Sequence, residues 1–551
     1  MLSSDGSQSK TPKGKPFKLF LCIVLLLTFT IAAVQVSAQG SSHRTRIITV
    51  RYTEFEWWLL RWSDNLTVCQ VYIDHEGKPT NLEIFYQCES DVYQRWLEST
   101  PCSKSRNEDS HTCPGYYLFL ANTAPREKQV KVKLPSPEVS IEITHCESHQ
   151  EDSVCSEIPH LFIQAEEPLP NEHIFQIQGQ LNGTPFVCQG STCDVPLRPT
   201  TERGVPLSFW ADSTYGDSSA HYQGRVRLIK KSLAENEDQQ TYQVNLISDR
   251  YEKESFSSCS KAWHAFPALG TPPGWLSNPR TEEGLATDKP LTYLAGKLIS
   301  YGLADASVCP GGGLLSNGYA SACGLSETRT IVTNWQNKYD PYIIRAAQEV
   351  GIPSQLLKNV FIQESQLWPE NLEGETSEHG LGHLTEWGAD TTLLWNNHFF
   401  AEFCPFVLSE KTCKLGYGNL EEEEKDLLQG ALLREVSLTG QELTEEDHFN
   451  ETYDHILLFA ESLLGQCKQT RQIIYNYSEK QPGDVSSYED LWRFTLVNYH
   501  AGSGCLGEAI EQVISEEKPV SWYFVSSALN VNCPNAVEYI TKITGEKTIH
   551  P

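Results

Sequence analysis

Residues 354–369 decide how the C-terminal part of this chain folds, and they read Ser-Gln-Leu-Leu-Lys-Asn-Val-Phe-Ile-Gln-Glu-Ser-Gln-Leu-Trp-Pro. Leu357, Val360 and Phe361 precede Glu364 at helical spacing, which places all four side chains on one face of a helix. Glu364 therefore projects from an apolar face near the C-terminal end of the predicted helix. Burial disfavours an ionised carboxylate, and so does the negative end of the helix dipole. Both effects favour the neutral acid, the form that donates a proton.

The segments around this helix also predict helices. Asp340-Pro341 marks a helix start, with Asp as the cap and Pro in the first turn, and Gly351 marks its end. We predict a mainly α domain over residues 336–551, preceded by a Pro- and Gly-rich linker and helical lead-in over 255–335. Further helices are expected at 288–300, 422–437, 454–476 and 488–501.

Three short motifs follow one another in this helical region and carry a family resemblance. Glu364-Ser365-Gln366-Leu367-Trp368-Pro369 resembles the Glu-Ser-x-aromatic-x-Pro signature of soluble lytic transglycosylases, the lysozyme-like enzymes that cleave murein. Gly380-Leu381-Gly382-His383 resembles the family's Gly-Leu-Met-Gln segment. Asn498-Tyr499-His500-Ala501-Gly502 resembles its Ala-Tyr-Asn-Ala-Gly segment. The matches occur in the family's order and span roughly residues 340–510.

The resemblance implies a lysozyme-like fold for residues 336–551 and cleavage of peptidoglycan glycan strands with no cofactor and no metal. Glu364 would protonate the glycosidic oxygen between N-acetylmuramic acid and N-acetylglucosamine, while the substrate's N-acetyl oxygen stabilises the cationic centre. Glu364 would then take the proton of the sugar 6-hydroxyl, which closes a 1,6-anhydro ring. The implied substrate-binding residues are Ser365, Gly380, Leu381, Gly382, His383, Tyr499 and His500.

Two alternatives stay open at this point. Gly382, His383 and His500 stand where the family has Met, Gln and Asn, which favours a non-catalytic envelope-binding protein that keeps the scaffold. A water-using lysozyme is the other alternative, and it would need a second carboxylate to position water. The candidates for that carboxylate by sequence proximity are Glu375, Glu378, Glu386 and Asp390.

The N-terminal half predicts β structure. Short alternating runs separated by turns suggest two sandwich-like modules, 39–135 and 136–254, divided near Pro135-Ser136-Pro137, with the second Ig-like. Asn182-Gly183 between two such runs is the strongest hairpin signal. Strands are expected at 65–74, 82–88, 116–122, 129–134, 139–145, 175–180, 184–188, 205–211, 225–229 and 242–247. The predicted fold class is therefore multidomain, with all-β modules before a mainly α lysozyme-like domain.

Composition and charge argue against some classes of binding partner. Of 551 residues, 39% are hydrophobic and 21% charged, which is typical of a globular protein. The formal net charge of −28 argues against nucleic acid as a partner and against electrostatic docking on anionic lipid or on anionic wall polymers.

The N-terminus and the cysteines predict export. Lysines precede an apolar run that begins at residue 19, and Val36-Ser37-Ala38 offers the small residues that a signal peptidase reads. Residues 1–38 therefore serve as a cleaved signal peptide or as a retained membrane anchor, with 19–38 about long enough to span a bilayer. The expected location is secreted or in the extracytoplasmic envelope. Close cysteines predict local disulfides at Cys102–Cys113, Cys146–Cys155, Cys188–Cys193 and Cys404–Cys413.

Overall fold

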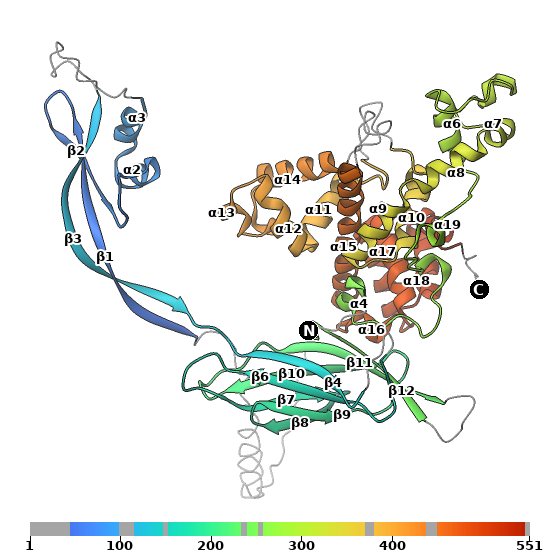
Figure 1. Cartoon of the computed structure of the whole chain (residues 1–551), viewed down its shortest axis with the longest axis horizontal. Helices are drawn as coiled ribbons and strands as arrows, with labels where there is room; N and C mark the ends of the chain where they lie inside the picture. The colour runs from blue at the N-terminus through green and yellow to red at the C-terminus, as the bar shows by residue number, and fades with distance from the viewer. Residues whose placement is uncertain are drawn as a thin grey trace, which may run out of the picture. The chain divides into compact units, whose positions relative to one another are not determined.

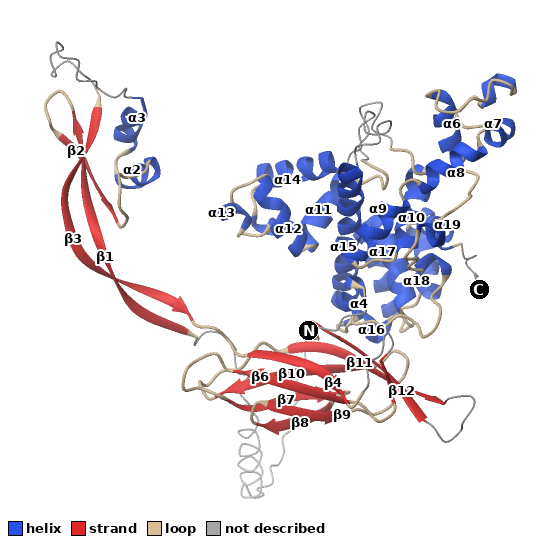
Figure 2. Ribbon diagram, in the orientation of Figure 1, coloured by secondary structure: helices blue, strands red, loops and turns tan. Residues whose placement is uncertain are grey.

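The computed structural model describes residues 44–98, 115–146, 153–232, 240–251, 257–369, 379–436 and 449–545. A β-sheet region precedes a mostly helical region, which confirms the predicted multidomain layout (Figures 1 and 2). Chain contacts divide the molecule into two compact units. Unit 1 runs to Glu138 and includes the loops Glu167–His173 and Ser213–Ser219. Unit 2 holds Val139–Glu166, Ile174–Asp212 and Ala220–Pro551.

Unit 1 is built on a long antiparallel ribbon. Strand β1 (Thr45–Arg61) pairs along its whole length with β3 (Tyr116–Lys133), and β2 (Thr67–Ile73) adds to its other edge. Helices α2 (Asn81–Gln87) and α3 (Ser90–Glu98) follow β2. The described part of this module is thus one three-stranded sheet with helices, and the predicted sandwich is wrong here.

The predicted strand at 82–88 is wrong for a local reason. Thr80 and Glu83 form a capping box, in which each side chain accepts a hydrogen bond from the other residue's backbone N–H. This satisfies the first orphan donors of α2 and starts a helix where side-chain alternation suggested a strand. A disulfide between Cys69 and Cys88 then ties the end of α2 to β2.

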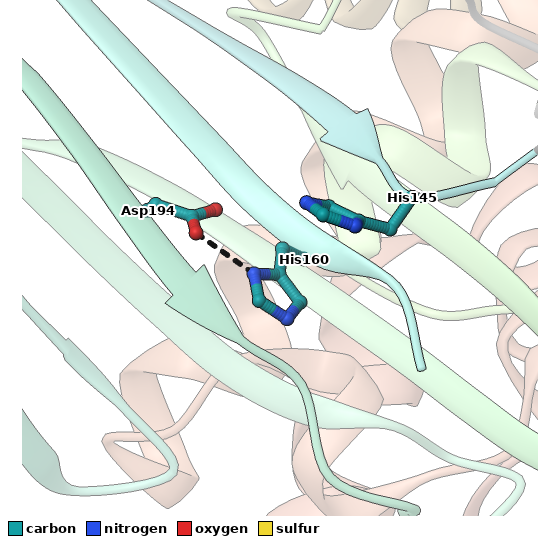
Figure 3. Close-up of side chains that lie close together, drawn as sticks. All are labelled: His145, His160 and Asp194. Carbon is teal, nitrogen blue, oxygen red and sulfur yellow. Dashed lines mark hydrogen bonds and ion pairs between the residues drawn. The ribbon is translucent and has the colours of Figure 1, made fainter. Parts of the chain in front are cut away.

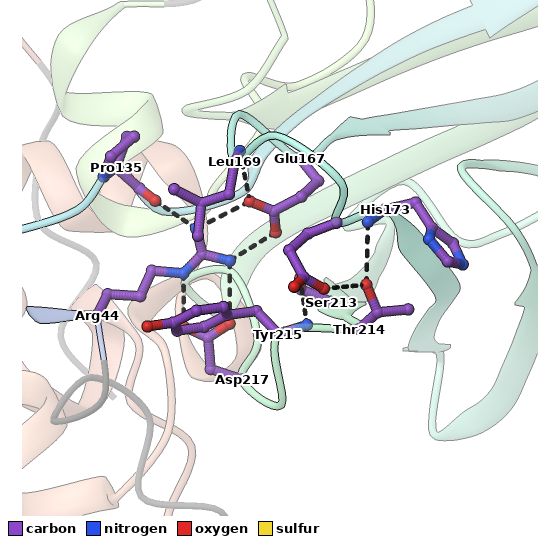
Figure 4. A network of polar contacts seen from close by, with 10 residues as sticks. Arg44, Pro135, Glu167, Leu169, His173, Ser213, Thr214, Tyr215 and Asp217 are labelled. Carbon is purple, nitrogen blue, oxygen red and sulfur yellow. Dashed lines mark hydrogen bonds and ion pairs between the residues drawn. The ribbon is translucent and has the colours of Figure 1, made fainter. Parts of the chain in front are cut away.

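Arg44, which directly precedes β1, lies within a network of polar contacts (Figure 4). Its side chain is 3% exposed and forms ion pairs with Glu167 at 2.5 Å and Asp217 at 2.6 Å. The guanidinium also donates to the carbonyl oxygen of Pro135 and lies 5.2 Å from the ring centre of Tyr215. A buried guanidinium is tolerated when carboxylates accept the hydrogen bonds of its N–H groups. Because Glu167 and Asp217 lie in the two loops of unit 1, these ion pairs connect the start of the ribbon to both loops.

The strands of unit 2 form a sandwich of two sheets. One sheet has six strands in the order β5-β12-β11-β10-β7-β8, and the other has the order β4-β6-β9. Ile141, Ile163, Phe209 and Leu228, drawn from both sheets, are at most 1% exposed and share one core. The strands are β4 (Glu138–Thr144), β5 (Ser153–Cys155), β6 (His160–Glu166), β7 (Ile174–Leu181), β8 (Thr184–Gln189), β9 (Thr192–Pro196), β10 (Val205–Ser213), β11 (Tyr222–Ser232) and β12 (Gln240–Ser248).

The β7–β8 hairpin confirms its prediction. Asn182 and Gly183 join the two strands with φ of 51° and 74°, the left-handed backbone that this dipeptide favours.

The helical region follows the sandwich. Its longest helices, α15 and α17, pack against each other. The helices are α4 (Ser258–Trp263), α5 (Glu282–Leu285), α6 (Thr292–Ser300), α7 (Ala322–Glu327), α8 (Arg329–Asn337), α9 (Asp340–Val350), α10 (Ser354–Ser365), α11 (Glu386–Trp395), α12 (Asn397–Phe403), α13 (Glu410–Cys413), α14 (Glu422–Glu435), α15 (Phe449–Ser478), α16 (Pro482–Val485), α17 (Tyr488–Ser515), α18 (Trp522–Asn532) and α19 (Pro534–Thr544).

Two expectations about these helices need correction. Asp340 begins α9 without capping it, because its carboxylate forms an ion pair at 2.6 Å with the fully buried Lys358. The helix predicted at 488–501 continues to Ser515, across a break at Gly502 where φ is 84°.

Seven disulfides lie in the described residues and indicate an oxidising, extracytoplasmic environment. Three of them confirm predicted pairs: Cys146–Cys155, Cys188–Cys193 and Cys404–Cys413. Among the described residues, no helix combines the length and hydrophobicity needed to cross a membrane. The predicted pair Cys102–Cys113 and the apolar segment 19–38 lie outside the described residues.

Candidate active site

Helix α10 presents Glu364 from its last turn. Leu357, Val360 and Phe361 on the same face are fully buried, whereas the Glu364 side chain keeps 16% of its surface exposed. The helix ends directly after it, because Gln366 adopts a left-handed backbone with φ of 47°. The carboxylate therefore stands at the edge of the helical core, where one part of it is buried and another part reaches solvent.

Tyr539 and His383 bring polar groups to this carboxylate. The hydroxyl of Tyr539 donates a hydrogen bond to Oε1 of Glu364, and Nδ1 of His383 lies 3.8 Å from Oε2. Burial, together with the negative charge of Glu364, raises the pKa of Tyr539 well above its usual value, so the phenol keeps its proton and remains a donor. Donation to a carboxylate stabilises the anion. Tyr539 thus opposes the burial and helix-dipole effects that favour the neutral acid.

Tyr539 reaches Glu364 because α19 is held against α10 and α17. A disulfide between Cys505 and Cys533 ties the second half of α17 to the residue just before α19. At the other end of α19, the side-chain amide of Asn359 donates to the carbonyl oxygen of Ile543 at 3.1 Å. A covalent bond at one end and a hydrogen bond at the other therefore fix the helix that carries the phenol.

Sequence reasoning missed Tyr539. Ala536, Ile540 and Ile543 recur with it at helical spacing, so the pattern indicates only a core aromatic residue. The structure also places the predicted His500 against this tyrosine, since the two rings stack at 3.9 Å with 4° between their planes. Burial lowers the pKa of His500, and Lys542 adds to the effect, which favours the neutral imidazole.

The second motif forms a tight turn beside Glu364. His379 and Leu384 exchange backbone hydrogen bonds of 3.0 and 2.9 Å across it. Gly380 has φ of 69°, and a Cβ there would lie 2.2 Å from a carbonyl oxygen. A Cβ at Gly382 would lie 2.0 Å from the ring of Phe459. This aromatic ring fills the space beside Gly382, so the turn requires glycine where the resembled family has methionine.

The other two motifs hold this turn in place. The Ser365 hydroxyl, on α10, lies 2.8 Å from the carbonyl oxygen of Leu381, to which it donates, and Ser365 is 1% exposed. The Tyr499 hydroxyl, on α17, donates to the carbonyl oxygen of Gly382. Ser365, Leu381 and Gly382 thus support the loop that carries His383, and their predicted contacts with substrate stay predictions. Hydrogen bonds thus link α10, the turn and α17, and His383 of the turn lies 3.8 Å from the Glu364 carboxylate.

The candidate second carboxylates lie in different settings. Glu386 begins α11 and is exposed, whereas Asp390 accepts a hydrogen bond from the Tyr417 hydroxyl. Glu375 and Glu378 lie outside the described residues. Within the part of the chain that the structure describes, the one group of three side chains spaced to hold a metal ion lies in the sandwich.

Comparisons with protein-family models, with curated proteins and with solved structures find no match to this chain. The family resemblance therefore rests on the three motifs, and the geometry around Glu364 is an independent observation.

Proposed function

We propose that this chain is an exported lytic transglycosylase with a lysozyme-like catalytic domain, acting on peptidoglycan glycan strands. The observation that carries the proposal is that the three motifs contact one another beside Glu364, a carboxylic acid that is mostly buried yet still reaches solvent. A general acid needs this setting, because burial favours its proton and the exposed part gives access to substrate.

The proposed reaction uses one carboxyl group twice. Glu364 gives its proton to the glycosidic oxygen as the bond between that oxygen and C1 of N-acetylmuramic acid breaks. The substrate's N-acetyl oxygen stabilises the cationic C1. The sugar's 6-hydroxyl oxygen then bonds to C1 and its proton returns to Glu364, so no water is consumed. Tyr539 binds Oε1, and we assign the proton transfers to Oε2, the oxygen that lies 3.8 Å from His383.

The roles of the neighbouring residues follow from the same arrangement. His383 and His500 offer imidazole nitrogens to the sugar, in the places where the resembled family has amide side chains. Tyr499 positions the turn, and through it His383, by its bond to Gly382.

Muropeptide analysis tests the proposal. The purified full chain is incubated with peptidoglycan, and the released fragments are weighed by mass spectrometry. We expect anhydro products that are one water lighter than hydrolysed fragments, and we expect Glu364→Gln to release none. Glu349→Gln is the matched control, because Glu349 accepts a hydrogen bond from Tyr453 much as Glu364 does from Tyr539.

Each contrary result has a distinct meaning. Hydrated reducing ends would make the protein a water-using lysozyme. If no product appears, and the parent and Glu364→Gln bind peptidoglycan equally well, the non-catalytic binding protein is correct.

A further inference from the structure

A cluster of metal-binding side chains lies in the sandwich, in a part of the molecule that the proposed reaction does not use. His145, His160 and Asp194 each offer one ligand atom, and the three atoms lie within 4.8 Å of one another. Figure 3 shows the three side chains gathered together, with a hydrogen bond between His160 and Asp194. We propose that this cluster binds a divalent transition metal ion, with zinc as the first candidate.

The sheet brings the three residues together by its strand order. His145 directly follows β4, His160 begins β6 and Asp194 lies within β9, and these strands are neighbours in the order β4-β6-β9. Alternate residues of β6 and β9 are buried in the core, and His160 and Asp194 occupy the other face. The ligands therefore sit on the outer face of the sheet, with access to ions from solvent.

Two covalent links hold this arrangement. Cys146, next to His145, is bonded to Cys155, and Cys193, next to Asp194, is bonded to Cys188. His145 also has φ of 59°, a backbone region that side-chain-bearing residues adopt uncommonly. A preorganised backbone lowers the entropy lost when ligands converge on an ion.

The distances suit a metal after a small rotation of the exposed His145 ring. Nδ1 of His160 lies 2.9 Å from a carboxylate oxygen of Asp194. Two atoms bound to one zinc ion lie at most about 4.4 Å apart, since each bond measures about 2.0–2.2 Å. His145 is exposed, and its ring lies 4.5 Å from that of His160, so rotation of its side chain can close the remaining gap.

The donor set selects the class of ion. Two imidazoles and one carboxylate suit zinc and its first-row neighbours, whereas calcium and magnesium prefer oxygen ligands alone. Three protein ligands also leave a coordination position for water or for another ligand. The alternative is that His160 and Asp194 form only a hydrogen bond at the surface and bind no metal ion.

Zinc titration of the full chain, stripped with a chelator and followed by calorimetry, tests the proposal. We expect one tight equivalent of zinc that excess calcium does not displace. His145→Ala, His160→Ala and Asp194→Asn should each weaken it at least about tenfold, because even the loss of a residue that only orients a ligand costs about 10–100-fold in affinity. His221→Ala is the matched control, since His221 is exposed in the same unit and stacks on Trp210.

Two further measurements separate loss of a metal ligand from loss of the fold. Far-UV circular dichroism in chelator should be the same for all variants, because the changed side chains lie on the outer face. Cobalt should give a visible absorption band with the parent that Asp194→Asn alters in energy or intensity. The proposal is overturned if the parent binds zinc no tighter than millimolar, or if the three ligand variants bind it as the parent does. Muropeptide release tests a separate site, so its failure would leave this outcome unaffected.

Discussion

Replacing Tyr539 with phenylalanine tests the physical account of the acid. The change removes one hydroxyl, the donor to Oε1 of Glu364. It keeps the aromatic ring, which is 4% exposed and stacks on His500 at 3.9 Å, so the packing of α19 should persist. The variant therefore isolates the hydrogen bond from the fold.

The magnitude follows from the kind of bond. A hydrogen bond to a charged group contributes about 1.5–3 kcal/mol. Glu364 is 16% exposed, so water replaces part of the lost interaction and the lower end applies. Removing about 1.5 kcal/mol of stabilisation from the carboxylate form shifts the pH at which the acid ionises by about one unit. Because the lost bond stabilised the anion, the variant should hold its catalytic proton to higher pH.

The assay is the pH dependence of kcat/KM for muropeptide release. The limb that falls at high pH reports loss of the proton from the free enzyme's acid, and we expect Tyr539→Phe to move it upward by about one unit. Tyr453→Phe, which removes the corresponding bond to Glu349, should leave it in place. A limb that stays still or moves downward in Tyr539→Phe would refute the argument that this phenol stabilises the carboxylate.

Three further substitutions probe the framework. Gly382→Ala should destabilise the helical region by about 1–3 kcal/mol and lower muropeptide release, because the added methyl group meets the Phe459 ring. Gly430→Ala is the control, because a methyl group there meets nothing within 4 Å and should not destabilise the protein. Equal shifts in melting temperature for the two variants would contradict this reasoning. Lys358→Met leaves the buried Asp340 carboxylate without its ion-pair partner and should lower the free energy of unfolding by about 3–5 kcal/mol. An unchanged urea unfolding midpoint would show that the ion pair does not stabilise the fold. Burial, with two nearby arginines, lowers the pKa of His264 to about 4 from 6.5, so the unfolded chain takes up its proton first as pH falls. Stability should drop by up to about 3 kcal/mol between pH 6.5 and 4, and a slope that His264→Asn fails to flatten would exclude this histidine as its source.

The helices of the C-terminal region could be predicted because apolar residues at helical spacing indicate a face that is buried. The prediction for α10 needed only residues within two turns of Glu364, and the structure bears it out. The strand expected at 82–88 failed because side-chain alternation competes with capping, and the pair Thr80–Glu83 starts a helix there.

Cysteine pairing shows the same division between local and distant information. Cys146–Cys155 and Cys404–Cys413 could be predicted because closing a short loop costs little entropy. Cys259–Cys467 spans 208 residues, and only the packing of α4 against α15 brings its two ends together. No pattern within a sequence window contains that packing.

The candidate site combines both kinds of information in one residue. Burial on α10 and the end of its helix dipole act through residues near Glu364 in sequence, and both favour the protonated acid. Tyr539 acts through the tertiary fold, from a helix that a disulfide fixes, and it favours the anion. A group that first gives a proton and then takes one back needs both forms within reach of ambient pH. In the proposed reaction Glu364 plays both parts, and the local and tertiary influences on its ionisation act in opposite directions. The donor that sequence reasoning missed is therefore the part of the site that offsets the preference for the neutral acid.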